Sequence, residues 1–362
     1  MSASEIRSRR IVFSLFIVSY VLLGAIVVLA FIQSPNFGIN PRMTIEDMID
    51  GTAFRPFVYR LLIPKLAGLL VYLTPSSIEI NMNAFLQSSQ WVWQILHLNP
   101  ATARLIFSQP TILYTRFVIV LIVSLCIAGY VCVQYRLGKV LFPQSWAVAL
   151  FAPIVGLLII PACTLPSLMM YDPGVLFLSA MCYYCLAKEQ WKRYCFWLFI
   201  ASLNKETAIY IVLFYGLYFY PRLPRKQYFT YLIAQVLICG YTKLVIDIYY
   251  VNNPGFILEN HSLQHLFNFL HPRYTVEDIF ILLASFYLLV ARWQQKPLFA
   301  RYILFVSVAL YTTYCWYGNI GEYRVFFDVL PLITLLISDS IMVGSGLSVC
   351  PIFTNKKADH NA

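Results

Sequence analysis

Three acidic residues, Glu46, Asp47 and Asp50, follow the first long apolar segment of the chain. On a helix, positions 46 and 50 would share a face, and so would positions 47 and 50. Paired carboxylates of this kind can act as a general base or hold a divalent cation. Thr44 and Asp47 also have the spacing of a capping box, and Gly51 is suited to end a helix. The residue types leave both interpretations open.

A second polar group, Asn204, Lys205 and Glu206 with Thr207, interrupts an otherwise apolar stretch. Such residues are costly in hydrocarbon, so they must face a cavity, a water-filled cleft or the outer surface. One alternative is a hairpin tip with Asn204 as N-cap. The other is a broken helix that lines a site. Two features favour the broken helix: both flanking helices are short, and a simple turn needs no Lys–Glu pair.

Two more charged positions border apolar segments. Asp172 precedes Pro173, a pattern typical of a helix start, and a functional role would require it to point into an outer cavity. Arg324 opens the last apolar block, where the positive end of the helix dipole is unfavourable for a cation. Its expected partners are Glu322, Asp328 or an anionic ligand such as a phosphate.

The remaining polar residues give no metal or cofactor site. His261 and His265 have helical spacing, but the glutamate of a zinc-binding H-E-x-x-H motif is absent. Lys243 and Asp247 are four residues apart in one apolar block, which predicts a self-satisfied ion pair. We therefore predict no cofactor, with a divalent cation at the first acidic cluster as the one possibility.

The composition indicates what must position these side chains. Of 362 residues, 60% are hydrophobic and 12% charged, and the mean hydropathy is +0.70. Soluble domains carry roughly a quarter charged residues, so a soluble enzyme, a disordered chain and a coiled coil are excluded. The net charge of +10 does not indicate nucleic-acid binding, because the basic residues form short clusters between apolar segments.

Apolar blocks of spanning or near-spanning length occupy residues 11–32, 112–135, 145–163, 174–187, 191–203, 207–220, 228–250, 279–291, 301–317 and 324–343. They predict an all-α, polytopic transmembrane bundle of about ten spans, several of them short. We expect a single transmembrane domain over residues 1–346 and a polar cytoplasmic tail over residues 347–362.

The distribution of charge predicts the topology. With a cytoplasmic N-terminus and one crossing per block, the inner segments hold 16 of the 26 basic residues. Of the 16 acidic residues, 12 fall on the outer side or in the outer halves of spans. This asymmetry indicates a multi-pass integral membrane protein with both termini inside, in the plasma (inner) membrane if the source is bacterial. The site is expected to face outward.

The first outer loop, residues 33–110, is long enough for structure of its own. Arg55, Arg60 and Lys65 lie along a Pro-interrupted apolar run, and steps of five residues turn a helix by about 140°, so the three cations do not share a face. A re-entrant or interfacial piece is expected there. Residues 83–96, with Trp91 and Trp93, predict an interfacial amphipathic helix that anchors the loop.

Three strings carry a resemblance to a known family: FRPFVYRLLIP at residues 54–64, LNKETA at 203–208 and GEYR at 321–324. Together with the first outer loop and its acidic cluster, they resemble the GT-C superfamily of polytopic glycosyltransferases. Members of that superfamily use polyprenyl-phosphate-linked sugars. Here the acidic cluster reads Glu-Asp-x-x-Asp and not Asp-Asp or Asp-x-Asp.

The resemblance implies an inverting transfer of sugar from a polyprenyl-phosphate donor to a glycan or lipid acceptor. It makes Asp47 or Glu46 the candidate base, with Asp50 second. The leaving phosphate would bind Arg55, Arg60 or Arg324. The remaining residues of the predicted site are Lys65, Asp172, Asn204, Lys205, Glu206 and Glu322.

Two other classes of protein fit the same sequence. A transporter or flippase for a lipid-linked or anionic solute would use the broken segment at residues 204–207 at mid-depth. A non-catalytic membrane subunit would use every polar cluster as a helix cap. An enzyme requires Glu46 or Asp47 to converge with Glu206 and the Glu322–Arg324 pair on one outward cleft.

Overall fold

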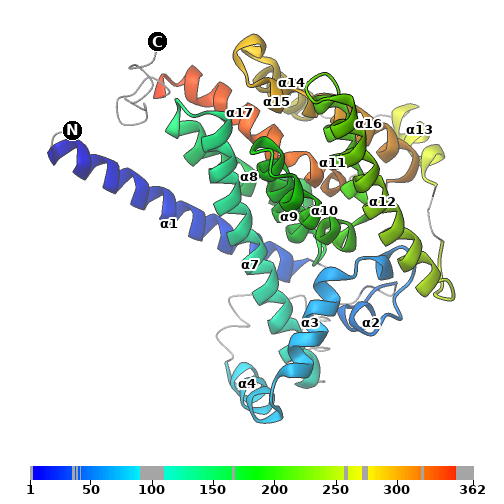
Figure 1. Ribbon diagram of the computed structural model, residues 1–362. Coiled ribbons are helices and arrows are strands. Elements are labelled where there is room, and N and C mark those ends of the chain that lie inside the picture. Colours follow the sequence, from blue (N-terminus) through cyan, green and yellow to red (C-terminus); the bar gives the residue numbers. More distant parts are fainter. Residues whose placement is uncertain are drawn as a thin grey trace.

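The computed structural model describes residues 3–34, 37, 40, 42–89, 110–164, 168–256, 260–270, 276–318 and 322–347. Within these residues every regular element is a helix, and an isolated parallel bridge joins Arg55 to Gly255. The predicted all-α class is therefore confirmed for the described part of the chain (Figure 1). Residues 348–362 of the predicted tail lie outside the described residues.

Each predicted apolar block contains a helix. These helices are α1 (Ala3–Gln33), α7 (Pro110–Leu141), α8 (Trp146–Thr164), α9 (Asp172–Ala187), α10 (Trp191–Asn204), α11 (Ile209–Phe219), α12 (Arg225–Tyr249), α14 (Val276–Val290), α16 (Ile303–Tyr317) and α17 (Leu330–Gly344). Short apolar segments form helices here because their backbone groups must be satisfied internally wherever water is excluded.

Four stretches in the described residues are long and apolar enough to cross a bilayer: Arg10–Gln33, Ile112–Leu141, Arg225–Tyr249 and Leu298–Tyr317. The last begins with the short helix α15 (Leu298–Arg301). Other apolar helices, such as α9 and α17, have 16 and 15 residues. The structure is thus compatible with a helical membrane protein, while the count of ten spans and the sidedness stay predictions.

The distribution of apolar side chains distinguishes inner from outer helices. α9 is buried along most of its length, between α7 and α10. In contrast, α1 and α12 carry many exposed apolar side chains, including Leu15, Val21, Leu237 and Leu244. Apolar surface of this extent is costly in water and is expected where a protein contacts lipid chains.

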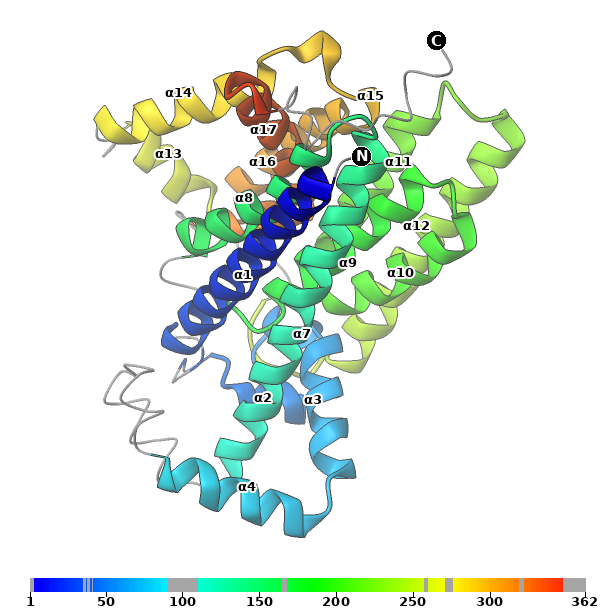
Figure 2. The ribbon, with the colours of Figure 1, turned by 90° about the vertical axis from the view of Figure 1, so that its left-hand side faces the viewer.

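The first loop forms a small helical layer at one end of the bundle. It contains α2 (Ile45–Asp50), the 3₁₀ turn η2 (Phe57–Tyr59), α3 (Leu62–Leu73) and α4 (Ser76–Ser88). Figures 1 and 2 show α2, α3 and α4 gathered at the same end, beside the beginning of α7. The run expected to be re-entrant is η2 and α3. The expected amphipathic segment begins within α4, while Trp91 and Trp93 lie outside the described residues.

The segment after α12 holds this loop in place. The side-chain amide of Asn253 donates to the carbonyls of Gly51 and Ala53 at 2.8 and 2.9 Å. Arg55 donates through its backbone to Pro254 O at 2.8 Å and through Nη2 to Gly255 O at 2.7 Å. These bonds fix the chain just before η2, so they determine where Arg60 lies.

Candidate functional site

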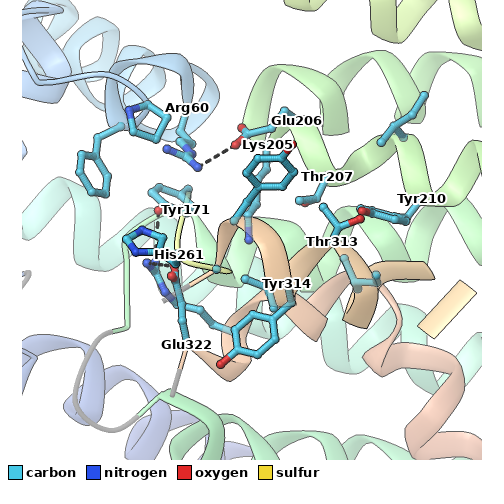
Figure 3. A pocket seen from close by; sticks show the side chains of 18 residues that line it. Arg60, Tyr171, Lys205, Glu206, Thr207, Tyr210, His261, Thr313, Tyr314 and Glu322 are labelled. Atoms are coloured by element: carbon cyan, nitrogen blue, oxygen red, sulfur yellow. Dashed lines mark hydrogen bonds and ion pairs between the residues drawn. The ribbon is translucent and has the colours of Figure 1, made fainter. Parts of the chain in front are cut away.

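A cavity of about 300 Å³ opens where the first loop meets the turn between α10 and α11. Its wall comes from η2, from the α10–α11 junction, from His261 just before α13 (Ser262–Leu270), from the end of α16 and from η5 (Tyr323–Asp328). The polar side chains that line it are Arg60, Tyr171, Lys205, Glu206, Thr207, Tyr210, His261, Thr313, Tyr314, Tyr317, Glu322 and Arg324 (Figure 3).

The first charged pair in the cavity is Arg60 with Glu206. Arg60 Nη2 donates to Glu206 Oε1 at 2.8 Å, and the guanidinium lies 5.2 Å from the centre of the Tyr171 ring. Arg60 is only 8% exposed. Its Nε and Nη1 atoms and Glu206 Oε2 are buried without a hydrogen-bond partner. Buried donors and acceptors are normally paired, so these atoms are available to a ligand.

The second charged pair is Arg324 with Glu322, joined at 2.5 Å between Nη2 and Oε1. Arg324 Nη1 also donates to the Tyr171 hydroxyl at 3.2 Å and lies 3.3 Å from Asp172 Oδ2. Asp172 is completely buried and accepts a second bond from the backbone of Met169. It therefore lies behind Arg324 as a positioning group, at the N-terminus of α9 as its sequence predicted.

The expected pairing of Arg324 with Asp328 is wrong. Glu322 is a partner, as expected, but Asp328 accepts a hydrogen bond from Ser179 at 3.3 Å. The reason is that residues 323–328 form the 3₁₀ helix η5 and not the first turn of α17. With three residues per turn, positions 324 and 328 point about 120° apart.

The polar interruption at residues 204–207 lies in the turn between two antiparallel helices. α10 ends at Asn204, Lys205 has extended backbone angles (φ −160°, ψ 139°), and a 3₁₀ turn from Glu206 to Ala208 leads into α11. Asn204 is not an N-cap, because its amide donates to Tyr171 O at 3.0 Å.

α10 and α11 run antiparallel, because the Trp191 ring at the beginning of α10 lies 5.0 Å from the Phe219 ring at the end of α11, and the Tyr194 and Tyr215 rings stack at 6.4 Å. The segment is therefore a hairpin tip, without Asn204 as its N-cap, and the prediction of a broken helix is wrong. The tip nevertheless lines the cavity.

Lys205 gives the cavity a third cation. The residue is 5% exposed, and within the described residues its ammonium has no carboxylate within ion-pair distance. The three cations Arg60, Lys205 and Arg324 thus share one cavity with the carboxylates of Glu206 and Glu322. A desolvated group of this kind suits an anion, because its guanidinium and ammonium donors form strong charge-assisted bonds to phosphate oxygens.

The acidic cluster of the first loop lies apart from this cavity. Asp47 closes the capping box: Thr44 Oγ1 donates to Asp47 Oδ2 at 2.6 Å and accepts from the Asp47 backbone at 3.0 Å. Glu46 pairs with Arg116 of α7 at 3.2 Å. Asp50 is exposed at the end of α2. None of these three acidic residues lines this cavity or the second cavity described below. Of the residues expected to converge on one cleft, only Glu206, Glu322 and Arg324 do so.

The three cations of the first loop diverge, as their spacing predicts. Arg60 enters the cavity, Arg55 binds Gly255 O, and Lys65 donates to Ile49 O at 2.7 Å. The latter two hold the loop together. A divalent cation at the acidic cluster has no assembled site, and the described residues contain no group of three His, Cys, Asp or Glu side chains that could hold a metal ion.

A second cavity of about 300 Å³ lies between α10, α11 and α12. It is lined by Tyr59, Ser202, Glu206, Ile209, Val236, Cys239, Gly240, Lys243 and Ile246. Glu206 belongs to both cavities. The predicted ion pair of Lys243 with Asp247 is confirmed at 2.6 Å, and the same ammonium lies 3.9 Å from the centre of the Tyr59 ring.

Several residues of the site were not identified from the sequence. Tyr171 connects both arginines, and its position directly before Asp172 was the available signal. Thr207, Tyr210, Thr313 and Tyr314 carry no local signature, because they meet through packing of distant helices. Comparison of the chain with models of known protein families, with curated proteins and with solved structures found no match.

Proposed function

We propose that the chain is a membrane glycosyltransferase that takes a sugar from a polyprenyl-phosphate donor at the cavity of Arg60, Glu206 and Arg324. The observation that carries this proposal is the meeting of three cations and two carboxylates in one cavity of an apolar helical bundle. A lipid phosphate supplies the anion, and the bundle gives access from the bilayer. The resemblance of residues 54–64, 203–208 and 321–324 to GT-C strings supports it, because Arg60, Glu206 and Arg324 belong to those strings.

The reaction needs a base and a site for the leaving phosphate. The base removes the proton of the acceptor hydroxyl, the hydroxyl oxygen bonds to the anomeric carbon, and the bond from that carbon to the phosphate oxygen breaks. Polyprenyl phosphate leaves with the bonding electrons. The free donors of Arg60 and the unpaired Lys205 are suited to stabilise this charge, since they are already desolvated.

We assign the base to Glu206. Its Oε1 is held by Arg60, while Oε2 has no partner and belongs to a residue of the cavity wall. The earlier candidates have other roles in this structure, since Asp47 caps α2 and Glu46 pairs with Arg116. Asp47 stays a competing prediction for the base, and kinetics of matched variants decide between the two.

The proposal is tested by incubating the purified full-length protein with polyprenyl-phosphate-linked sugars that carry a radiolabel, together with glycan and lipid acceptors. We expect labelled product, and an Arg60→Gln variant should lose at least about 100-fold in rate because a donor to the leaving phosphate is removed. Lys65→Gln is the matched control, since it removes a cation of the same loop that lies outside both cavities. Equal losses in both variants would contradict the assignment.

A transporter of an anionic lipid or solute is the second candidate, favoured by one observation. The cavity holds charged side chains inside an apolar helical bundle, and such residues mark the substrate and ion pathways of transporters. Sealed vesicles distinguish the two functions. A transporter moves labelled lipid-linked sugar across the membrane unaltered, whereas the transferase releases polyprenyl phosphate and forms a new glycoside.

A further inference from the structure

The second cavity follows one face of α12. Its lining residues Val236, Cys239, Gly240, Lys243 and Ile246 are spaced by three, one, three and three positions, which places them on one stripe of a helix. At 1.5 Å per residue this stripe is about 15 Å long. The opposite wall comes from α10 and from the beginning of α11, through Ser202 and Ile209.

The cavity changes character along this stripe. At the end toward Ile246 it holds Glu206, Lys243 and Tyr59, and Glu206 connects it to the first cavity. At the end toward Val236 the α12 residues are Val236, Cys239 and Gly240, without a charged group. An amphiphile fits such a gradient with its charged end at Glu206 and its hydrocarbon end at Val236.

The apolar end opens on a surface suited to lipid. Val236 is 48% exposed, and its neighbours Ile233, Leu237 and Leu244 are exposed as well. All belong to the stretch from Arg225 to Tyr249, which is long and apolar enough to cross a bilayer. A hydrocarbon chain can therefore enter the cavity from the side without passing through water.

We propose that this second cavity binds the isoprenoid chain of the lipid donor, with the phosphate held between Arg60 and Lys243. The inference rests on the proposed function and adds the route of the chain, between α10 and α12. Charge complementarity supports the orientation, because Arg60 lines the first cavity, Lys243 lines the second, and both cations interact with Glu206, which the two cavities share. These two cations would receive an anionic head group. Gly240 leaves the space for the chain: a Cβ atom there would meet no other atom within 4 Å.

Gly240→Leu is the most direct test. A leucine there fills the cavity without disturbing a neighbour, because the position is open and lies inside a helix. The measurement is binding of radiolabelled undecaprenyl phosphate and of geranyl phosphate to the full-length protein in nanodiscs. We expect the variant to bind undecaprenyl phosphate at least about tenfold more weakly while geranyl phosphate binds within about twofold of wild type, since a tenfold change corresponds to about 1.4 kcal/mol.

Two further variants complete the experiment. Val236→Trp should reproduce the selective loss, because it blocks the mouth of the cavity. Gly344→Leu is the matched control, since a Cβ at Gly344 also meets nothing within 4 Å but lies at the end of α17, outside both cavities. Unchanged binding of undecaprenyl phosphate to Gly240→Leu and Val236→Trp would overturn the chain route and leave the proposed function standing. Failure of wild type to bind either phosphate would reject the proposed function and the chain route together.

Discussion

Two groups of carboxylates in this molecule look alike in sequence and differ in structure. In α2, the oxygens of Asp47 are bonded to Thr44 and Thr52, and Glu46 is paired with Arg116. At the turn after α10, Glu206 keeps an oxygen without a partner, and its ion pair comes from Arg60, 146 positions earlier in the chain. The first group is satisfied as it stands, whereas the second is complete only with a ligand.

The difference shows how a cap and a site can be separated. A capping carboxylate uses partners within one or two turns, so its bonds form with the helix itself. A site carboxylate takes its partners from distant elements and keeps an oxygen atom without a hydrogen bond. An unpaired buried oxygen destabilises the fold, so it is not expected in a group whose role is purely structural. The cavity contains several such atoms, on Arg60, Glu206, Thr207 and Arg324.

The largest predicted effect separates the two groups by kinetics. Glu206→Gln should lower the rate of sugar transfer about 10²- to 10⁴-fold, because the amide cannot accept the proton of the acceptor. Asp47→Asn should change the rate less than about fivefold while weakening the cap of α2. Transfer rates per folded molecule, with yield in the membrane as the control for folding, make the comparison. Loss of turnover in Asp47→Asn with full activity in Glu206→Gln would reverse the assignment.

A second prediction concerns stability and not catalysis. Glu46→Ala leaves the guanidinium of Arg116, which is 1% exposed, without its carboxylate partner. The expected loss is about 2 kcal/mol in the free energy of unfolding, since a hydrogen-bonded charge is removed at a partly exposed site. Thermal unfolding in detergent measures it. Transfer activity at a temperature well below the transition should persist, and its loss there would contradict a structural role for Glu46.

A smaller effect tests the capping box directly. Thr44→Ala removes the hydroxyl that accepts from the Asp47 backbone and donates to its carboxylate. The free energy of unfolding should fall by about 1 kcal/mol. Thr52→Ala is the comparison, because its hydroxyl makes only long bonds to Asp47, at 3.2 Å to Oδ1 and 3.5 Å to the backbone carbonyl, and should matter less. If both variants were as stable as wild type, the cap would not hold this loop.

The last predicted effect is of similar size and is a dependence of stability on pH. It concerns a buried cation that belongs to neither group of carboxylates. Lys296, between α14 and α15, donates to the Leu288 and Leu336 carbonyls and to Ser340. Burial lowers the pKa of this ammonium to about 8. The pKa of Lys296 is lower in the folded protein than in the unfolded chain. The buried ammonium therefore destabilises the fold fully below pH 8, and this destabilisation decreases as the pH rises from 8 toward the pKa of the unfolded chain. Stability should gain about 1 kcal/mol between pH 8 and 9, and Lys296→Met should flatten this part of the melting-temperature profile.

Much of the fold could be predicted from the sequence, because apolar blocks determine helices wherever backbone groups must pair internally. Each block from residues 11–32 to 324–343 contains a helix. The capping box and the Lys243–Asp247 pair were also predictable, since both depend on residues within one turn. Local rules therefore account for the elements and their caps.

The site was less predictable, because it depends on which elements pack together. Spacing indicated that Arg55, Arg60 and Lys65 diverge but could not indicate which of them enters a cavity. Arg116 was the neglected signal. A cation inside an apolar block requires a partner, and the acidic residues of the first loop, at positions 46–50 and 79, were candidates. The structure selects Glu46.

The contact between Leu61 and Leu203 has a mechanical consequence. The backbone amide of Leu61, next to Arg60, donates to the carbonyl of Leu203 near the end of α10 at 3.0 Å. The loop that carries the guanidinium and the helix end that carries the carboxylate are thereby coupled, so a displacement of one strains the other. Hydrogen exchange at this amide should slow when an anion occupies the pocket, which makes one backbone proton a reporter of occupancy.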